Sequence, residues 1–264
     1  MLQELVYFII CFICTTLGAI SGIGGGVIIK PLMDAVSGMN ASTVSFLAGL
    51  TVEAMAIVSI AQHFVKKEST TLEPRRGTLL AVGSVAGGIA GKSLFSWFKA
   101  LTGQEQAVAA GQNIVLFLLT VLVFVYYIKK SAIQTKNVQS NAACLGVGLV
   151  LGLLSAFLGI GGGPINLMVL SYLFSMDAKT AALHSLYIIL FSQTASLATT
   201  LLSASVPVFG WVTLIAMALG GVLGAFSGRS LNRRLSNQGV DKLFMGMLVI
   251  ILGICLYNTV RFMA

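Results

Sequence analysis

The sequence predicts an all-α polytopic membrane protein made of two helical halves that form an inverted-topology repeat. Three observations predict this fold class: the composition, the long uncharged stretches and a duplicated glycine-rich motif. Of the 264 residues, 57% are hydrophobic and 9% are charged. Soluble domains carry about 25% charged residues, so this chain has too few to cover a water-facing surface. The composition excludes a soluble enzyme, a disordered scaffold and a disulfide-rich secreted module.

Apolar segments follow one another along almost the whole chain. Residues 5–29, 137–176 and 180–228 contain no Asp, Glu, Lys or Arg. A membrane-crossing helix needs about 20 mostly apolar residues. Glycines, prolines and charges divide the chain into segments 5–22, 25–38, 41–64, 77–98, 107–128, 142–159, 162–175, 180–203, 208–228 and 242–262. Segments 25–38 and 162–175 are too short to cross comfortably, so we expect about eight full spans plus two short or re-entrant segments broken by glycine.

The basic residues are unevenly distributed between the two predicted sides of the membrane. One side carries Lys66, Lys67, Arg75, Arg76, Lys129, Lys130, Lys136, Lys179, Arg229, Arg233, Arg234 and Lys242. The other side carries Lys30, Lys92, Lys99 and Arg261. Basic loops face the cytoplasm, which predicts a multi-pass protein of the cell membrane with both termini outside. The same bias explains the net charge of +8 without a nucleic-acid partner.

A duplication divides the chain into two halves. Gly-Ile-Gly-Gly-Gly at residues 22–26 recurs at residues 159–163, an offset of 137. Met-Asn-Ala-x-Thr from Met39 matches Met-Asp-Ala-x-Thr from Met176 at the same offset. A third motif, Gly-Gly-x-x-Gly, begins at Gly87 and again at Gly220. We therefore expect a first transmembrane repeat over 1–132, a cytoplasmic linker over 133–140 and a second repeat over 141–264.

The predicted orientation makes the two repeats antiparallel. Segment 41–64 runs from outside to inside, whereas its counterpart 180–203 runs from inside to outside. Inverted repeats are typical of secondary transporters, in which the substrate is held near the middle of the membrane. Channels share this architecture, so the repeat alone does not establish coupled transport.

The duplicated glycine runs are the predicted substrate site. Gly24, Gly25 and Gly26, with Gly161, Gly162 and Gly163, would interrupt helices and expose amide N–H groups that hold a small anion. Asn166 and Gln193 could add neutral hydrogen bonds. The alternative is that these glycines only permit close helix packing. Packing is the preferred interpretation for the regular glycine spacings at 83–91 and 220–228.

Three ionisable side chains within the predicted spans are candidates for a functional role. Glu53 is either a proton-coupling carboxylate or a structural residue, because membrane-embedded carboxylates usually face polar interiors. His184 could sense protons, but a satisfied structural histidine is the preferred interpretation. Lys30 lies one turn before Asp34, which favours a local ion pair, although Lys30 could instead attract anions to an outer vestibule.

The duplicated glycine motif, with Pro31 after the first run, resembles the TauE/SafE family of sulfite exporters over essentially the full length. That resemblance implies a membrane permease for small sulfur-containing anions such as sulfite, thiosulfate or sulfonates, and it maps the binding loops onto the two glycine runs. The chain departs from exact repetition because Met168 stands where Pro31 stands in the first half, whereas Pro164 adjoins the second run.

The predicted function is a permease that moves a sulfite-like or organosulfonate anion across the plasma membrane, as an exporter and with optional proton coupling. An anion channel or uniporter, or an importer of thiosulfate-like anions, is the alternative. An intramembrane enzyme lacks its usual motifs in this sequence, and a non-transporting accessory protein would more naturally carry a soluble domain. We expect no cofactor and no metal, with a small anion, the lipid bilayer and a homo-oligomeric copy as partners. The four cysteines are interpreted as apolar packing residues.

Overall fold

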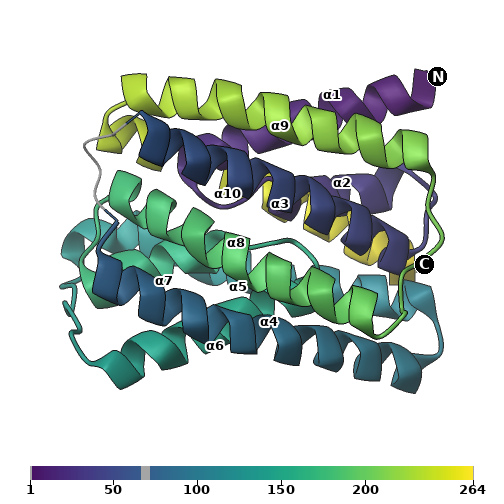
Figure 1. Ribbon diagram of the computed structural model, residues 1–264, viewed down its shortest axis with the longest axis horizontal. Coiled ribbons are helices and arrows are strands. Elements are labelled where there is room, and N and C mark those ends of the chain that lie inside the picture. Colours follow the sequence, from purple (N-terminus) through teal and green to yellow (C-terminus); the bar gives the residue numbers. More distant parts are fainter. Residues whose placement is uncertain (1, 67–71, 264) are drawn as a thin grey trace.

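The computed structural model describes residues 2–66 and 72–263, which form ten α-helices, one 3-10 turn and no β-strand (Figure 1). The elements are α1 (Leu2–Ser21), α2 (Gly26–Val36), α3 (Ala41–Val65), α4 (Pro74–Thr102), α5 (Glu105–Lys129), η1 (Lys130–Ala132), α6 (Asn141–Leu158), α7 (Pro164–Phe174), α8 (Ala178–Leu202), α9 (Trp211–Arg234) and α10 (Asn237–Met263). Eight of these helices are long and apolar enough to cross a membrane, which confirms the predicted all-α polytopic architecture.

Several helices extend beyond the apolar segments that predicted them. The helix expected over 208–228 continues to Arg234, and the helix expected from 242 begins at Asn237. Likewise, α4 begins at Pro74, whose missing N–H and fixed φ suit a first helical turn. Helices end where capping or proline stops them, whereas an apolar segment ends where the membrane does. For this reason, the apolar segments predicted helices that are too short at their polar ends.

Both short helices return toward the end of the molecule at which their preceding helix starts. In Figure 1, α2 runs back toward the side that holds both termini. At the opposite side, α7 ends beside the connection that precedes α6, because Lys136 and Val138 donate backbone hydrogen bonds to the carbonyls of Tyr172 and Leu173. The helix pairs α1–α2 and α6–α7 are therefore hairpins with a glycine turn at the tip.

The long helices pack in two sets of three. One set contains α1, α9 and α3, the other contains α6, α4 and α8, and α3 contacts α8 where the two sets meet (Figure 1). Helix α5 contacts α10 and α7, and α10 also contacts α2. Each set combines helices from both predicted repeats, so the halves interleave rather than forming separate bodies. The domain boundaries and the inverted relation of the halves remain predictions, although these contacts are those that a two-fold relation would generate.

Glycine stripes allow the closest helix contacts. A Cβ atom on any glycine of the α4 stripe would collide with a carbonyl oxygen of α6, and the α9 stripe stands in the same relation to α1. The α4 contacts are Gly83 with Leu145, Gly87 with Leu149 and Gly91 with Leu153; the α9 contacts are Gly220 with Phe8, Gly224 with Phe12 and Gly228 with Thr16. These contacts confirm that the regular glycine spacings serve packing.

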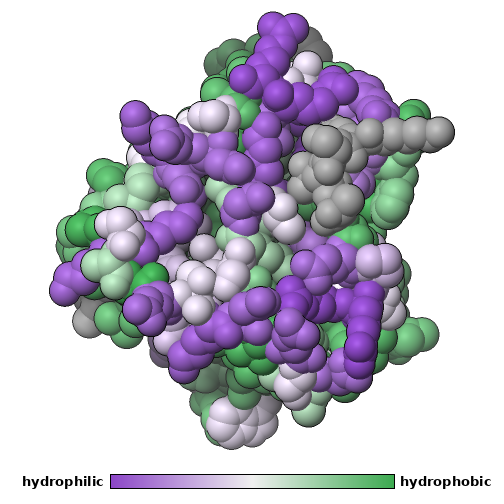
Figure 2. All heavy atoms as spheres, turned by 90° about the vertical axis from the view of Figure 1, so that its left-hand side faces the viewer, coloured by the Kyte–Doolittle hydropathy of each residue, from purple (hydrophilic) through white to green (hydrophobic). Residues whose placement is uncertain are grey.

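Hydrophilic side chains cover the end of the molecule that carries the connections α3–α4, α5–α6, α7–α8 and α9–α10 (Figure 2). This is the end at which most of the predicted cytoplasmic basic residues lie, although Lys67 lies outside the described residues. All four cysteines are free and buried, which agrees with a packing role. The assignment of this end to the cytoplasm remains a prediction.

Candidate anion-binding site

The two glycine runs form tight turns at the tips of the helical hairpins. Gly22 and Gly24 have φ values of 81° and 75°, and their counterparts Gly159 and Gly161 have φ values of 64° and 66°. Side-chain-bearing residues rarely adopt this left-handed region, so the turns require glycine at these positions. Helices α2 and α7 begin directly after the turns, with their N-termini inside the molecule.

The two turns lie against each other. A Cβ atom built on Gly24 would lie 3.2 Å from the carbonyl oxygen of Gly161, and one on Gly162 would lie 3.2 Å from the carbonyl oxygen of Ile23. A Cβ atom on Gly26 would overlap the carbonyl of Ile160. Segments 137 residues apart in the sequence thus meet backbone to backbone, at distances that only glycine allows.

Six amide groups in these turns have no acceptor among the described residues. They are the N–H groups of Gly24, Gly25, Gly26, Gly161, Gly162 and Gly163. Unpaired N–H groups away from water are costly, and nearly all buried amides in proteins are paired. Two adjacent helix N-termini also add positive partial charge at the same place. The arrangement can therefore stabilise a negatively charged group.

Two apolar side chains cover the turns. The side chain of Val52 in α3 lies against Gly161, and that of Ile189 in α8 lies against Gly162. Both residues are fully buried, and their numbers differ by the repeat offset of 137. The described conformation is therefore closed on the side of the turns that faces α3 and α8.

An open cleft leads toward the second turn from the side that holds both termini. It is narrow, with a volume of about 20 Å³, and it lies between α3, α4 and α8. Its polar side chains are those of Ser45, Lys92, Gln193, Ser196 and Thr200, and Gly159 of the second turn also lines it. The lining contains an ammonium, an amide and three hydroxyl groups but no carboxylate, which favours an anionic ligand. Lys92 also lies over the ring of Phe95, 4.9 Å from its centroid.

The structure places both predicted neutral donors near the turns. Gln193 is 3% exposed, and its Nε2 atom lies 3.2 Å from the Cβ position of Gly161. Asn166, in the first turn of α7, donates from Nδ2 to the Ser185 hydroxyl at 3.3 Å. The Asn166 Oδ1 atom is buried without a partner among the described residues.

Glu53 belongs to α3, and its side chain contacts α8. Its Oε1 atom accepts a 2.6 Å hydrogen bond from the exposed Thr194 hydroxyl. Its Oε2 atom is buried and has no partner in the described chain. A role of Glu53 in proton coupling remains a prediction.

Both ring nitrogens of His184 are used in structural contacts. Its Nδ1 atom lies 3.0 Å from the Thr180 carbonyl, and its Nε2 atom accepts a 3.3 Å hydrogen bond from the Glu73 amide at the start of α4. A neutral ring satisfies both contacts, because Nδ1 then donates and Nε2 accepts. The geometry supports the preferred interpretation of a structural histidine.

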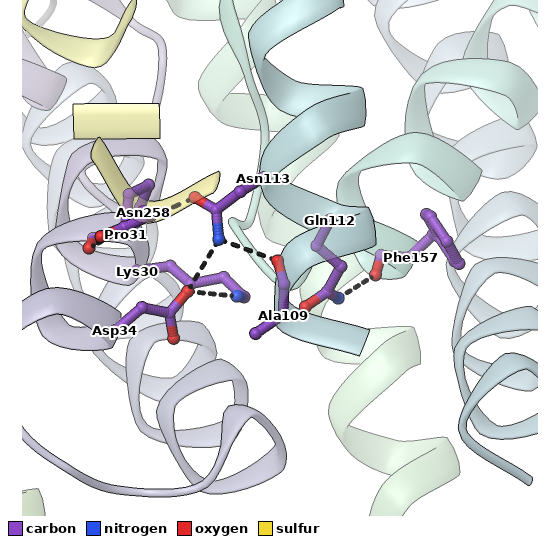
Figure 3. Close-up of polar contacts among 8 residues, drawn as sticks. All are labelled: Lys30, Pro31, Asp34, Ala109, Gln112, Asn113, Phe157 and Asn258. Atoms are coloured by element: carbon purple, nitrogen blue, oxygen red, sulfur yellow. Dashed lines mark hydrogen bonds and ion pairs between the residues drawn. The ribbon is translucent and has the colours of Figure 1, made fainter. Parts of the chain in front are cut away.

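Lys30 is buried rather than exposed in a vestibule. Its Nζ atom lies 2.8 Å from Asp34 Oδ2, and both side chains are 2% exposed. Asn113 in α5 donates to the same carboxylate oxygen at 3.4 Å, and Asn258 in α10 donates to Asn113 Oδ1 at 3.4 Å (Figure 3). The i, i+4 pair was predicted, but its amide partners were not, because nothing in the sequence links α2 to α5 and α10.

Comparison with known proteins decides the family. The family model described as sulfite exporter TauE/SafE matches residues 7–255. The chain belongs to the TauE/SafE family. TauE/SafE membership makes it a multi-pass membrane transporter. A similar protein, described as "Probable membrane transporter protein YunE" from Bacillus subtilis (strain 168), is 21% identical over 264 residues, covering 93% of this chain and 94% of the relative. No solved structure matches the chain.

Proposed function

We propose that the protein is a permease for a small sulfur-containing oxyanion and that the paired glycine turns hold the anion. The observation that carries this proposal is the set of six amide N–H groups without an acceptor where two helix N-termini meet. An oxyanion of the sulfite type presents several acceptor oxygens in a small volume, and it could accept hydrogen bonds from both turns at once. Helix N-termini bind such groups through free amides and the helix dipole.

The route to the turns would pass through the cleft between α3, α4 and α8. Lys92 would attract the anion into the cleft. Gln193, which lies between the cleft and the second turn, would donate a hydrogen bond to it on the way. Val52 and Ile189 would move aside as the anion enters. Since α3 and α8 carry these two residues and contact each other, a shift between the two helix sets would open one side at a time. Such rocking of inverted repeats about a fixed site is the usual mechanism of secondary transporters.

Export is the proposed direction, from the description of the matching family. The membrane potential of an inside-negative cell favours loss of an anion by about 2.3 kcal/mol per charge per 100 mV. A uniporter or channel would therefore also export, whereas import of a thiosulfate-like anion would require another driving gradient.

The test is flux in vesicles reconstituted with the purified protein. Sulfite, thiosulfate and a small sulfonate would be loaded separately, with chloride and a potassium salt of an impermeant anion as references. We expect saturable efflux of at least one sulfur oxyanion above the rate in protein-free vesicles. Equal rates in both kinds of vesicle for every anion would overturn the permease proposal.

A further inference from the structure

Contacts between helices in one half of the chain recur in the other half at the sequence offset of 137. A Cβ atom on Gly87 would collide with the carbonyl oxygen of Leu149, and one on Gly224 would collide with the carbonyl oxygen of Phe12. Gly224 follows Gly87 by 137 residues, and Leu149 follows Phe12 by the same number. These contacts therefore pair Gly87 with Gly224, one helical turn beyond the Gly220 that the shared motif indicated.

The contacts of the glycine turns recur in the same way at the two ends of the molecule. A Cβ atom on Gly159 would lie 2.7 Å from Cβ of Ser45, and one on Gly22 would lie 2.5 Å from Cβ of Ala182. Ser45 lines the cleft at the end that holds both termini, whereas Ala182 lies near the start of α8 at the opposite, hydrophilic end. The cleft thus has a counterpart region at the hydrophilic end, between α3, α8 and α9.

The counterpart region is closed in the described conformation. Ala56 stands at the position that corresponds to Gln193 of the cleft, and Leu186 stands at the position that corresponds to Gly49. Both are fully buried in an apolar cluster with the two side chains that cover the turns. The molecule therefore has a narrow cleft toward one end and apolar packing at the matching place toward the other.

Two polar side chains are buried in the closed region. Arg229 of α9 is the counterpart of Lys92, and Ser59 of α3 is the counterpart of Ser196. Arg229 is 3% exposed, and the fully buried Ser59 Oγ atom has no hydrogen-bond partner among the described residues. Arg234, further along α9, is exposed, as expected of a charge at the membrane surface. A buried arginine inside a membrane protein is costly and usually marks an ion or substrate pathway.

Arg229 and Ser59 lie at the same depth in neighbouring helices. Helices α3 and α9 both end at the hydrophilic end, and they meet where Gly221 approaches the carbonyl oxygen of Thr51. Ser59 follows Thr51 by eight residues, and Arg229 follows Gly221 by eight residues. Because the rise per residue is the same in both helices, the two side chains start from one level of the membrane domain.

We propose that Arg229 and Ser59 form an anion-binding site on a second access route, which opens between α3, α8 and α9 at the hydrophilic end. The ligand is the small oxyanion of the proposed function, on which this inference rests. A guanidinium presents two parallel N–H groups to an oxyanion, and the Ser59 hydroxyl adds a further donor. As this route opens, the cleft lined by Lys92 and Ser196 closes, so the anion reaches the glycine turns from one end at a time.

The route is tested with two single-cysteine variants that the repeat matches, Ser59→Cys and Ser196→Cys. An impermeant methanethiosulfonate reagent is applied to one side of membrane vesicles of known orientation. The four native cysteines are buried, so wild type supplies the background. We expect Ser196→Cys to react from the side of the termini and Ser59→Cys to react from the opposite side. Reaction of Ser59→Cys from neither side, or from the same side as Ser196→Cys, would overturn the second route.

The anion site is tested by the charge preference of the same reaction. Two reagents are compared, one with a sulfonate group and one with a trimethylammonium group, and each rate is divided by its rate with a small free thiol. In Ser59→Cys, the sulfonate reagent should be preferred, and this preference should weaken as salt is added. The absence of such a preference while Arg229 is intact would overturn the anion site without any further variant.

Variants of the arginine then assign the preference to one side chain. Added to Ser59→Cys, Arg229→Gln should lower the ratio of sulfonate to ammonium rates about tenfold, because a full charge is lost close to the reacting thiol. Arg229→Lys copies Lys92 and should keep the ratio, and Arg234→Gln is the control for an exposed charge of the same helix. An equal fall in Arg229→Gln and Arg234→Gln would overturn the site. A misfolded variant would be recognised by reaction of the buried native cysteines, and Arg229→Met would then replace Arg229→Gln.

Labelling does not depend on flux, so the two proposals can fail separately. Vesicles that move a sulfur oxyanion, together with Ser59→Cys that shows no route or no anion preference, would overturn this inference and leave the permease intact. Vesicles that move none of the anions would overturn the permease whatever the labelling shows.

Discussion

Replacement of Gly161 by alanine should separate the role of the turn in binding from its role in folding. At φ of 66°, any residue with a Cβ atom is strained by roughly 1–2 kcal/mol. The new methyl group would also lie 2.5 Å from Cγ1 of Val52 and 3.2 Å from Nε2 of Gln193. Overpacking of this kind adds about 1–3 kcal/mol. The backbone strain affects folding alone, whereas the overpacking occurs at the proposed anion site.

Gly38→Ala is the matched control. Gly38 also has φ of 66°, but an added Cβ atom there would meet nothing within 4 Å. Both variants should lose stability through backbone strain, and Gly161→Ala should lose more. Because the added methyl group would stand beside the proposed amide donors and 3.2 Å from Nε2 of Gln193, we expect Gly161→Ala to weaken anion binding roughly tenfold, which corresponds to about 1.4 kcal/mol. Sulfite flux and thermal unfolding in detergent measure the two effects, and equal flux in the two variants would refute the reasoning.

Three further predictions follow from the packing and charge of the helices. Gly87→Ala should destabilise the protein by about 1–3 kcal/mol in thermal unfolding, because its methyl group collides with a carbonyl of α6; Gly253→Ala, with open space around it, should be neutral or slightly stabilising, and equal effects would contradict the tight contact. Lys92→Met should slow anion flux severalfold and flatten its dependence on ionic strength, because the ammonium in the cleft is lost; an unchanged salt slope would exclude Lys92 from the route. Single cysteines at Ser140 and Ser205 should react with an impermeant reagent from opposite sides of the membrane, and reaction from one side would refute the inverted repeat.

The sequence was sufficient to predict the helical membrane fold, because a chain with so few charges cannot satisfy water-exposed surfaces. The duplication also indicated which segments correspond, and Val52 and Ile189 occupy corresponding positions over the turns. The packing role of the glycine stripes followed from their spacing. These features depend on composition and local periodicity, which a single sequence contains.

Contacts between helices that are distant in the sequence could not be predicted from the sequence. Lys92 was grouped with the outer basic residues, and only the meeting of α3, α4 and α8 shows that it lines a cleft with Gln193. Asn113 and Asn258 are 145 residues apart, and nothing local indicates that they share a network with Asp34. Such sites are assembled from different helices, so their members have no common sequence signal.

The central claim is that backbone amides of the two turns bind the anion, and glycine-selective 15N labelling tests it most directly. The chain has 29 glycines, of which six supply the proposed amides. Titration of the labelled protein with sulfite should shift the amide signals of Gly24–Gly26 and Gly161–Gly163 together and saturably, and leave exposed glycines such as Gly38 unchanged. Saturable shifts confined to glycines outside the two turns, or no shift at any glycine, would contradict the account.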